Sequence, residues 1–189
     1  SPQLVLAAGA SCRCLWPQLP ASLRFSWAGV LVAPAAAPSL PSPSPWLRHA
    51  RRGGIVQPLN WRRPALEAQV PGLESQAWIV DAGLAPWGEQ LLLGQISLVG
   101  PQLDPQSPPD PALMERRLRQ GLADLDPRLG DWEGVYRQVA VPFCSDGRPL
   151  VGPAKGEPGL WLFTGFSGAF STVPDLAEDL ASQLALAMA

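Results

Sequence analysis

Apolar runs separated by turn residues predict that much of the chain forms short strands. The run at residues 3–10 is apolar and turns at Gly9, as a buried strand that enters a tight loop does. The run at residues 23–34 predicts one strand, or two short strands that meet at Gly29. Further apolar pieces with turns between them have the spacing of antiparallel strands. We expect these strands at residues 54–59, 77–83, 89–100, 134–143 and 159–163.

Residues 110–125 have the periodicity of an amphipathic helix. Leucines recur there at roughly helical spacing, with arginine and glutamate between them. Asp110 and Pro111 supply an N-cap and a first-turn proline, which predicts that the helix begins at this point. Residues 34–45 are different, because they contain mainly proline, alanine and serine. We expect a surface loop of polyproline character there.

A second helix is predicted over residues 172–189. Thr172 is its expected N-cap, Pro174 lies in its first turn, and Asp175 stands where a capping-box acid belongs. This helix follows the strand at 159–163 after a short turn, so the end of the chain has a strand, turn and helix order.

The turn between that strand and helix is Thr164-Gly165-Phe166-Ser167-Gly168. A strand that ends in glycine-rich turn residues before a helix points backbone N–H groups at one place, where the helix dipole adds partial positive charge. Such a turn binds anionic or electron-rich atoms, and glycine leaves room for a flat ligand to approach the backbone. The same pattern is also that of a plain packing turn. The turn by itself therefore does not assign a ligand.

Charge and composition narrow the classes of function. The chain has 189 residues, a hydrophobic content of 47% and a formal net charge of −2, which gives no electrostatic case for a nucleic-acid partner. No run approaches the roughly 20 apolar residues of a membrane span, so no membrane partner is expected. Cys12, Cys14 and Cys144 are best explained as free thiols in a reducing, cytoplasmic compartment. With a lone Cys-x-Cys pair and His49 as the single histidine, no metal site is expected.

Three segments together resemble one protein family. They read "LVLAAGASCRCL", "DGRPLVGP" and "GLWLFTGFSGAFSTVPDLAEDLA", and they begin at residues 4, 146 and 159. In this order they resemble segments of the FAD-dependent amine oxidases of the D-amino acid oxidase and glycine/sarcosine oxidase type. Between them, "WIVDAGLAPWGEQLLLGQ" resembles a hairpin of that family's substrate domain. The resemblance extends over nearly the whole chain.

The resemblance implies an α/β fold with the C-terminal part of an FAD-binding Rossmann-like domain and an antiparallel-sheet substrate domain. Residues 1–22 would end the FAD-binding domain, residues 23–143 would form the substrate domain, and residues 144–189 would return to the FAD-binding domain. The implied reaction is oxidation of the C–N bond of an amino acid or small amine by hydride transfer to flavin N5. Flavin carries the redox chemistry, so no catalytic side chain is assigned.

The resemblance also implies which residues bind FAD and substrate. Members of the family that bond flavin to a cysteine place it further from the aspartate than Cys144 stands from Asp146, so FAD is expected to bind noncovalently. Arg137 is the first candidate for a substrate carboxylate, Arg148 is the second, and Tyr136 is a candidate cover for a small substrate; structural ion-pair and core roles are the alternatives. The residues implied to contact the cofactor are Ala8, Gly9, Ala10, Gly165, Phe166, Ser167, Gly168 and Ala169.

The family's G-x-G-x-x-G turn, which holds the FAD pyrophosphate, does not occur in the sequence. The chain therefore resembles the C-terminal half of the family, and the N-terminal FAD-binding half is expected in the same gene or on a separate chain. Two alternatives stay open: a non-catalytic remnant or interaction domain that binds no flavin, and an unrelated small-ligand binding protein. Alone, such a half would expose apolar surface and is expected to aggregate or stay loosely folded.

Overall fold

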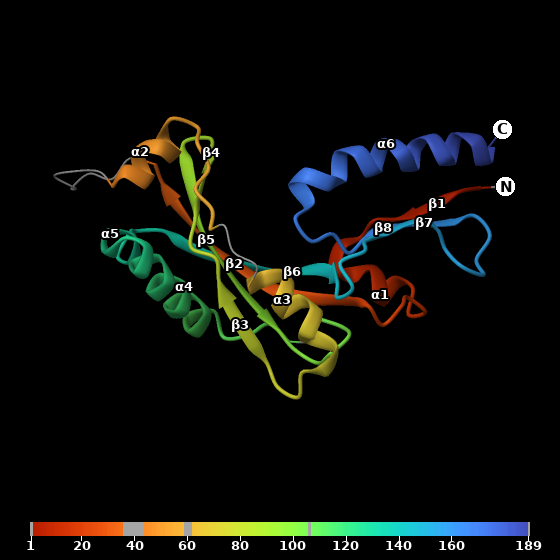
Figure 1. The fold of residues 1–189 in the computed structure, drawn as a ribbon, viewed down its shortest axis with the longest axis horizontal. Helices are drawn as coiled ribbons and strands as arrows, with labels where there is room; N and C mark the ends of the chain where they lie inside the picture. Colours follow the sequence, from red (N-terminus) through yellow and green to blue (C-terminus); the bar gives the residue numbers. More distant parts are fainter. Residues whose placement is uncertain (1, 36–43, 59–61, 106, 189) are drawn as a thin grey trace.

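The computed structural model describes residues 2–35, 44–58, 62–105 and 107–188, and these form two β-sheets with helices packed around them. In Figure 1 the smaller sheet lies on the right, beneath the last helix, and the larger sheet extends to the left. Both chain ends lie at the side of the smaller sheet. This arrangement is a mixed α/β fold, as the sequence predicts.

The smaller sheet has the strand order β1-β8-β7. β1 (Leu4–Leu6) runs parallel to β8 (Leu160–Thr164), and β7 (Leu150–Pro153) is antiparallel to β8. The expected first strand is confirmed, but it is not buried throughout: Leu4 is 65% exposed and Leu6 is 7% exposed. The β1 edge therefore carries apolar side chains with little cover.

The larger sheet has the order β3-β5-β2-β6, and β4 also pairs with β5. β2 (Leu23–Pro34) is a single strand whose register shifts between Gly29 and Val30, so the irregularity expected at Gly29 is a bulge and not a break. Its neighbours are antiparallel to it. The other strands are β3 (Ala77–Val80), β4 (Leu84–Trp87), β5 (Gln90–Val99) and β6 (Val135–Cys144).

The prediction of a strand at residues 54–59 is wrong for residues 54–58, which are the described part. Val56 forms only an isolated bridge with Leu84, and residue 59 lies outside the described residues. The loop expected at 34–45 likewise falls mostly on residues that are not described. Proline at position 58 and glycines at 53 and 54 restrict pairing to this one bridge, because proline lacks an N–H donor and glycine weakens a strand.

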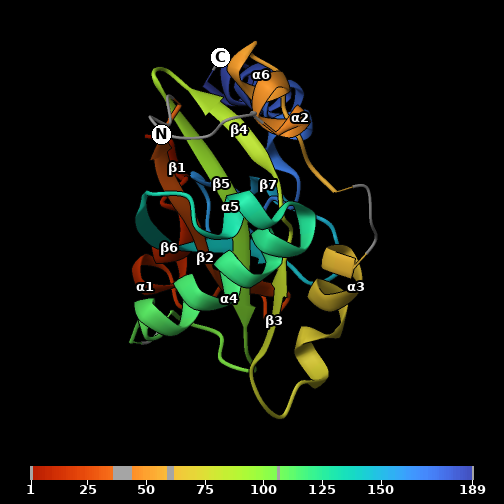
Figure 2. The same cartoon turned by 90° about the vertical axis from the view of Figure 1, so that its left-hand side faces the viewer.

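α4 (Pro111–Leu125) is the predicted amphipathic helix, and its N-cap is confirmed because an Asp110 carboxylate oxygen accepts a hydrogen bond from the Ala112 N–H at 3.0 Å. Figure 2 shows α4 and α5 (Pro127–Gly130) in front of the larger sheet. α2 (Pro45–Arg51) and α3 (Arg62–Gln69) are short helices without a predicted counterpart. The remaining short helices are η1 (Gly9–Ser11), α1 (Cys12–Leu15) and η2 (Val70–Gly72).

α6 (Ala169–Met188) begins three residues before the predicted start, so Thr172 is not its N-cap and Pro174 lies inside the helix. The physical reason is the turn before it: Gly168 has φ +68°, and the chain direction is reversed by that point. Pro174 is the sixth helical residue, beyond the first four N–H groups that have no helical partner, so it leaves one helical carbonyl without its N–H donor.

The main core lies between α4 and the larger sheet. Leu118 is fully buried in it with Leu31, Leu93, Ile96 and Met114. Leu118→Ala is expected to lower the free energy of unfolding by about 3 kcal/mol, because it leaves a cavity in close-packed surroundings. Urea denaturation of the variant in the complete protein measures this loss. Leu113→Ala, on the exposed side of the same helix, is the matched control and is expected to cost less than about 0.5 kcal/mol.

Candidate functional site

The candidate site lies where two parallel neighbouring strands end. Leu6 is paired with Leu162, so the carboxyl ends of β1 and β8 meet at one edge of the smaller sheet. The segment that follows β1 contains Ala8, Gly9 and Ala10, and the segment that follows β8 contains residues 165–168. In open α/β sheets, ligands bind outside the carboxyl ends of the strands. Both segments that the sequence assigned to the cofactor therefore lie at this edge.

Gly165 is buried and forms the base of the second segment. Its carbonyl accepts a hydrogen bond from the Cys144 N–H at 3.0 Å, and its φ is +81°. A Cβ added here would lie 2.5 Å from the Cys144 Sγ and 2.9 Å from a Leu23 methyl carbon. Glycine is thus required at position 165 because the backbone packs closely against Cys144 and Leu23. The reason expected from the sequence was different, namely that glycine leaves room for a ligand.

Gly168 and Gly9 provide the open part of the site. Their φ values are +68° and +58°, and no atom lies within 4 Å of a Cβ built on either residue. Ser167 and Ala169 are exposed beside Gly168, while Phe166 is half-buried with its ring centroid 4.7 Å from that of Phe163. The space beside both glycines is open where a Cβ would stand, which suits the approach of a flat group.

Thr164 adds an unusual polar atom at the end of β8. Its side chain is buried at 2% exposure, and its hydroxyl oxygen has no hydrogen-bond partner among the described residues. Buried polar atoms almost always have a partner, so an unpaired hydroxyl marks a place where a further polar group fits. Together with the open glycines, this hydroxyl makes the edge compatible with a planar, hydrogen-bonding cofactor such as flavin.

Ser167 is joined to a helix that the sequence did not predict. Its hydroxyl donates a 2.7 Å hydrogen bond to a carboxylate oxygen of Glu67 on α3. Burial raises the pKa of Glu67; the Ser167 hydrogen bond and the Arg63 guanidinium oppose this rise, and Asp81 adds to it. An acidic side chain therefore lies next to the segment assigned to flavin.

A polar cluster attaches α3 to the larger sheet. The Arg63 Nε donates to an Asp81 carboxylate oxygen at 2.6 Å, and its Nη1 donates to the Ser97 hydroxyl at 2.8 Å. Gln95 donates to the same hydroxyl at 3.1 Å. Sequence reasoning missed this cluster and Glu67. The available signal was the spacing of four residues that face inward at helical intervals, namely Arg63, Leu66, Glu67 and Val70.

The structure separates two substrate candidates. Tyr136 pairs with Leu31 on the α4 side of the larger sheet, where its hydroxyl donates to Gln138 at 3.2 Å and burial raises its pKa to about 12. Arg137 points to the opposite face and is exposed beside Val135 and Val139. Neighbouring residues of a strand face opposite sides of its sheet, so these two side chains do not meet in one pocket.

Arg137 and Arg148 lie at different distances from the candidate site. Seven positions separate Arg137 from Cys144, which contacts Gly165, so Arg137 is roughly 23 Å away along β6. Arg148 is exposed in the turn between β6 and β7, where its N–H donates to Asp146 at 3.1 Å. A substrate that reaches either arginine must extend along the sheet or over this turn.

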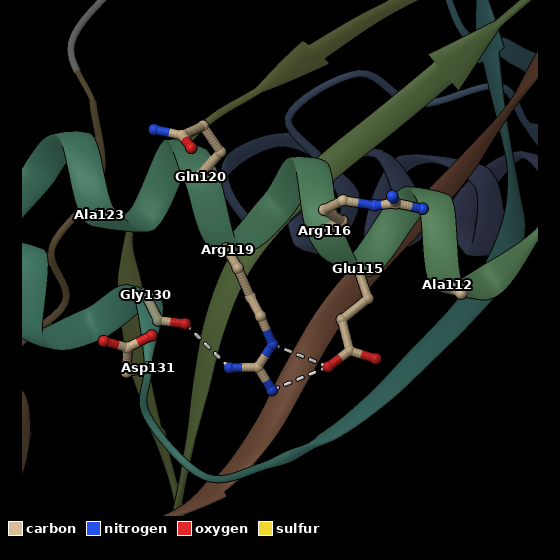
Figure 3. A pocket seen from close by; sticks show the side chains of 8 residues that line it. All are labelled: Ala112, Glu115, Arg116, Arg119, Gln120, Ala123, Gly130 and Asp131. Carbon is tan, nitrogen blue, oxygen red and sulfur yellow. Dashed lines mark hydrogen bonds and ion pairs between the residues drawn. The ribbon is translucent and has the colours of Figure 1, made fainter.

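A well-defined hollow on the described surface lies elsewhere. It has a volume of about 420 Å³ and runs between α4 and α5 (Figure 3). The Arg119 guanidinium crosses it, bonds to Glu115 at 2.8 Å and donates to the Gly130 carbonyl at 3.0 Å. A second hollow of about 160 Å³ beside Trp27 is smaller than a usual ligand pocket. We assign a structural role to the Figure 3 hollow, because the Arg119–Glu115 ion pair lies within α4 and the hydrogen bond from Arg119 to the Gly130 carbonyl fastens α5 to α4.

The fold is of the class that the sequence predicts, part of the fold of the FAD-dependent oxidoreductases. Residues 1–183 match the profile of the family described as FAD dependent oxidoreductase (DAO), and the chain belongs to this family. No match was found among curated proteins. Among the described residues, none forms a group suited to hold a metal ion, and no helix is long and apolar enough to cross a membrane.

Two solved structures share the fold. Glycine oxidase from Geobacillus kaustophilus aligns with a TM-score of 0.59 and 20% identity, over 96% of this chain and 41% of that chain. A modified fructosyl peptide oxidase from Aspergillus nidulans aligns with a TM-score of 0.55 and 16% identity, over 96% of this chain and 42% of that chain. The 189 residues thus span about two fifths of the length of these oxidases.

Proposed function

We propose that the chain is the C-terminal portion of an FAD-dependent oxidoreductase that oxidises the C–N bond of an amino acid or small amine. The observation that supports this most is the open, glycine-containing edge where the parallel strands β1 and β8 end. FAD, when bound, supplies the hydride acceptor at its N5. The protein residues supply binding, orientation and electrostatic stabilisation.

The flavin would be held by backbone rather than by charged side chains. Ala8, Gly9 and Ala10 would lie beside the dinucleotide, and residues 165–169 would face the edge of the isoalloxazine ring. Backbone N–H groups fixed in this position stabilise negative charge that develops on a bound group, without the cost of reorganising water. The unpaired Thr164 hydroxyl at the same edge is consistent with this role.

Noncovalent binding of FAD is favoured by the state of the cysteines. Cys144, the thiol next to Gly165, is 1% exposed, and burial, with help from Asp146, raises its pKa to about 11. A protonated buried thiol is a poor nucleophile, so it is not suited to form a bond to flavin. The described cysteines are all free, which agrees with a cytoplasmic location.

The remaining FAD contacts would come from a dinucleotide-binding half outside these 189 residues, encoded in the same gene or as a separate chain. The sequence has no G-x-G-x-x-G turn for the pyrophosphate, and the oxidases with this fold are more than twice as long. The competing proposal is a non-catalytic domain of the same fold that binds no flavin.

The deciding experiment is to purify the chain together with its dinucleotide-binding half and to record the absorbance spectrum. Flavin bands in stoichiometric amount support the oxidoreductase, and a colourless folded protein that fails to take up added FAD supports the non-catalytic domain. Gly168→Val is expected to weaken FAD affinity at least about 10-fold, since it places a side chain in the open edge. Gly147→Val is the control, because Gly147 has a similar φ of +72° and equally open surroundings in the β6–β7 turn.

Arginine substitutions test the substrate class. If the substrate carries a carboxylate and is long enough to extend along β6 to Arg137, Arg137→Gln is expected to raise KM about 10-fold to 100-fold, the usual value of a charge-assisted hydrogen bond, with a smaller change in kcat. Steady-state kinetics with a panel of amino acids and amines measure this change. Arg148→Gln is the paired variant, and a larger effect there would move the carboxylate site to the β6–β7 turn. Unchanged KM in both variants would favour an amine without a carboxylate.

A further inference from the structure

The hydrogen bond between Ser167 and Glu67 connects parts of the chain that are otherwise distant. Ser167 belongs to the segment after β8, in the smaller-sheet part of the fold, and Glu67 belongs to α3, which lies against the larger sheet. The two residues are 100 positions apart in the sequence. This bond is therefore a direct link between the segment assigned to flavin and the layer that would face substrate.

α3 holds the Glu67 carboxylate in a fixed position. One turn before Glu67, Arg63 forms an ion pair with Asp81 and donates to Ser97. On the same side of the helix, Leu66 packs against the buried cluster formed by Val70, Val99 and Phe143. Because these contacts fasten α3 at both a polar and an apolar point, the carboxylate has little freedom to follow a moving partner.

We propose that Glu67 is a positioning residue for the segment at residues 165–168, and that its carboxylate fixes the Ser167 hydroxyl and so holds the backbone N–H groups of this segment at the ligand edge. The role at the ligand edge rests on the proposed function. The attachment of the segment to α3 does not.

The contact has the properties that a positioning role requires. Glu67 is 9% exposed, so water does not compete strongly for its oxygen atoms. A hydrogen bond to an ionised acceptor is about twice as strong as one between neutral groups. Gly165 fixes one end of the segment through its contact with Cys144, and the hydrogen bond of the Ser167 side chain adds a second fixed point next to Gly168.

The carboxylate also has an electrostatic consequence at the same place. A negative charge beside a bound ring opposes the gain of further negative charge on that ring. Replacement of Glu67 by glutamine keeps the shape but removes the charge. The midpoint potential of bound flavin is therefore expected to rise in Glu67→Gln, a change that a purely structural residue would not produce.

Hydrogen exchange in the flavin-free form of the complete protein tests the attachment. In Glu67→Gln, the amides of residues 165–168 are expected to exchange faster, by up to about 10-fold, since a charge-assisted hydrogen bond is replaced by a weaker neutral one. Ser167→Ala, which removes only the hydroxyl, is expected to give a similar increase in the exchange rate. The double variant is expected to exchange no faster than either single variant, because both substitutions act on the same hydrogen bond. Glu74→Gln is the control, because Glu74 is exposed on the segment after α3. Unchanged exchange in Glu67→Gln and Ser167→Ala would overturn the proposal.

Measurements with FAD separate this inference from the proposed function. With flavin bound, Glu67→Gln is expected to weaken FAD affinity and to raise the midpoint potential, and Glu74→Gln to change neither. One outcome is faster exchange in Glu67→Gln together with no FAD binding by the unmodified protein. This result would support the attachment of the segment to α3, but it would overturn the proposed oxidoreductase and the role of Glu67 at the ligand edge. Normal FAD binding with unaltered exchange, affinity and potential in Glu67→Gln would overturn the role of Glu67 and leave the oxidoreductase intact.

Discussion

Gly165→Ala is expected to lower the free energy of unfolding by about 3 kcal/mol or more, a larger loss than a single methyl group normally causes. Two costs add at this position. The φ of +81° lies in the left-handed region, which costs a non-glycine residue about 1–3 kcal/mol. The added Cβ would also lie 2.5 Å from the buried Cys144 Sγ, and overpacking of this kind costs about 1–3 kcal/mol.

Gly147→Ala separates these two costs. Gly147 has φ +72°, but no atom lies within 4 Å of a Cβ placed on it, so only the backbone cost of about 1–3 kcal/mol applies. Chemical denaturation of both variants in the complete protein gives the comparison. Equal losses of unfolding free energy in Gly165→Ala and Gly147→Ala would show that Cys144 and Leu23 move aside without cost. The close packing between β6 and the Gly165 turn would then not constrain the fold.

The elements that sequence reasoning found are those with a long, regular pattern. The strand expected at residues 134–143 is confirmed as β6, which pairs with β2 and carries Tyr136 and Arg137 on opposite faces. The leucine spacing of residues 110–125 and the Asp110 cap are likewise local signals that survive in α4. Such segments bury a whole face, so the hydrophobic pattern and the structure agree.

The missed elements are short or depend on distant contacts. α2 and α3 have 7 and 8 residues, too few for a helical period to stand out from proline-rich surroundings. Pro174 was a misleading signal, because the turn at Gly168 reverses the chain early enough to place proline inside α6. Local preference decided the prediction, whereas the tertiary position of the turn decides where this helix begins.

The candidate site was predictable only in outline. The two segments that meet after β1 and β8 could be found, because glycine next to a strand end is a local feature of the sequence. The helical spacing around Glu67 could have indicated α3, but it could not have indicated the hydrogen bond to Ser167, because the two residues are 100 positions apart. Burial of an acid is visible only once the fold is known.

Residues 1–189 expressed alone are expected to aggregate or to melt over a broad range, because the chain leaves much apolar side-chain surface uncovered. Leu4 and Val5 of the parallel strand β1 are 65% and 39% exposed, and on α6 Leu186 and Met188 are 79% and 71% exposed. Strands with parallel partners are normally covered on both faces, and β1 has one neighbour among the described strands. β1 is therefore an edge strand of the smaller sheet with exposed apolar side chains.

Light scattering, binding of a hydrophobic dye and thermal melting of the isolated chain measure this exposure. Co-expression with the dinucleotide-binding half is expected to abolish dye binding and to give a single sharp transition, since a further strand and helix would cover β1 and α6. The double variant Leu186→Gln, Met188→Gln is the matched test of the helix surface: it should improve the solubility of the isolated chain but weaken its association with that half. A sharp, cooperative melt of the isolated chain without dye binding would contradict the expectation, because it would mean that these surfaces are stable in water and need no covering polypeptide.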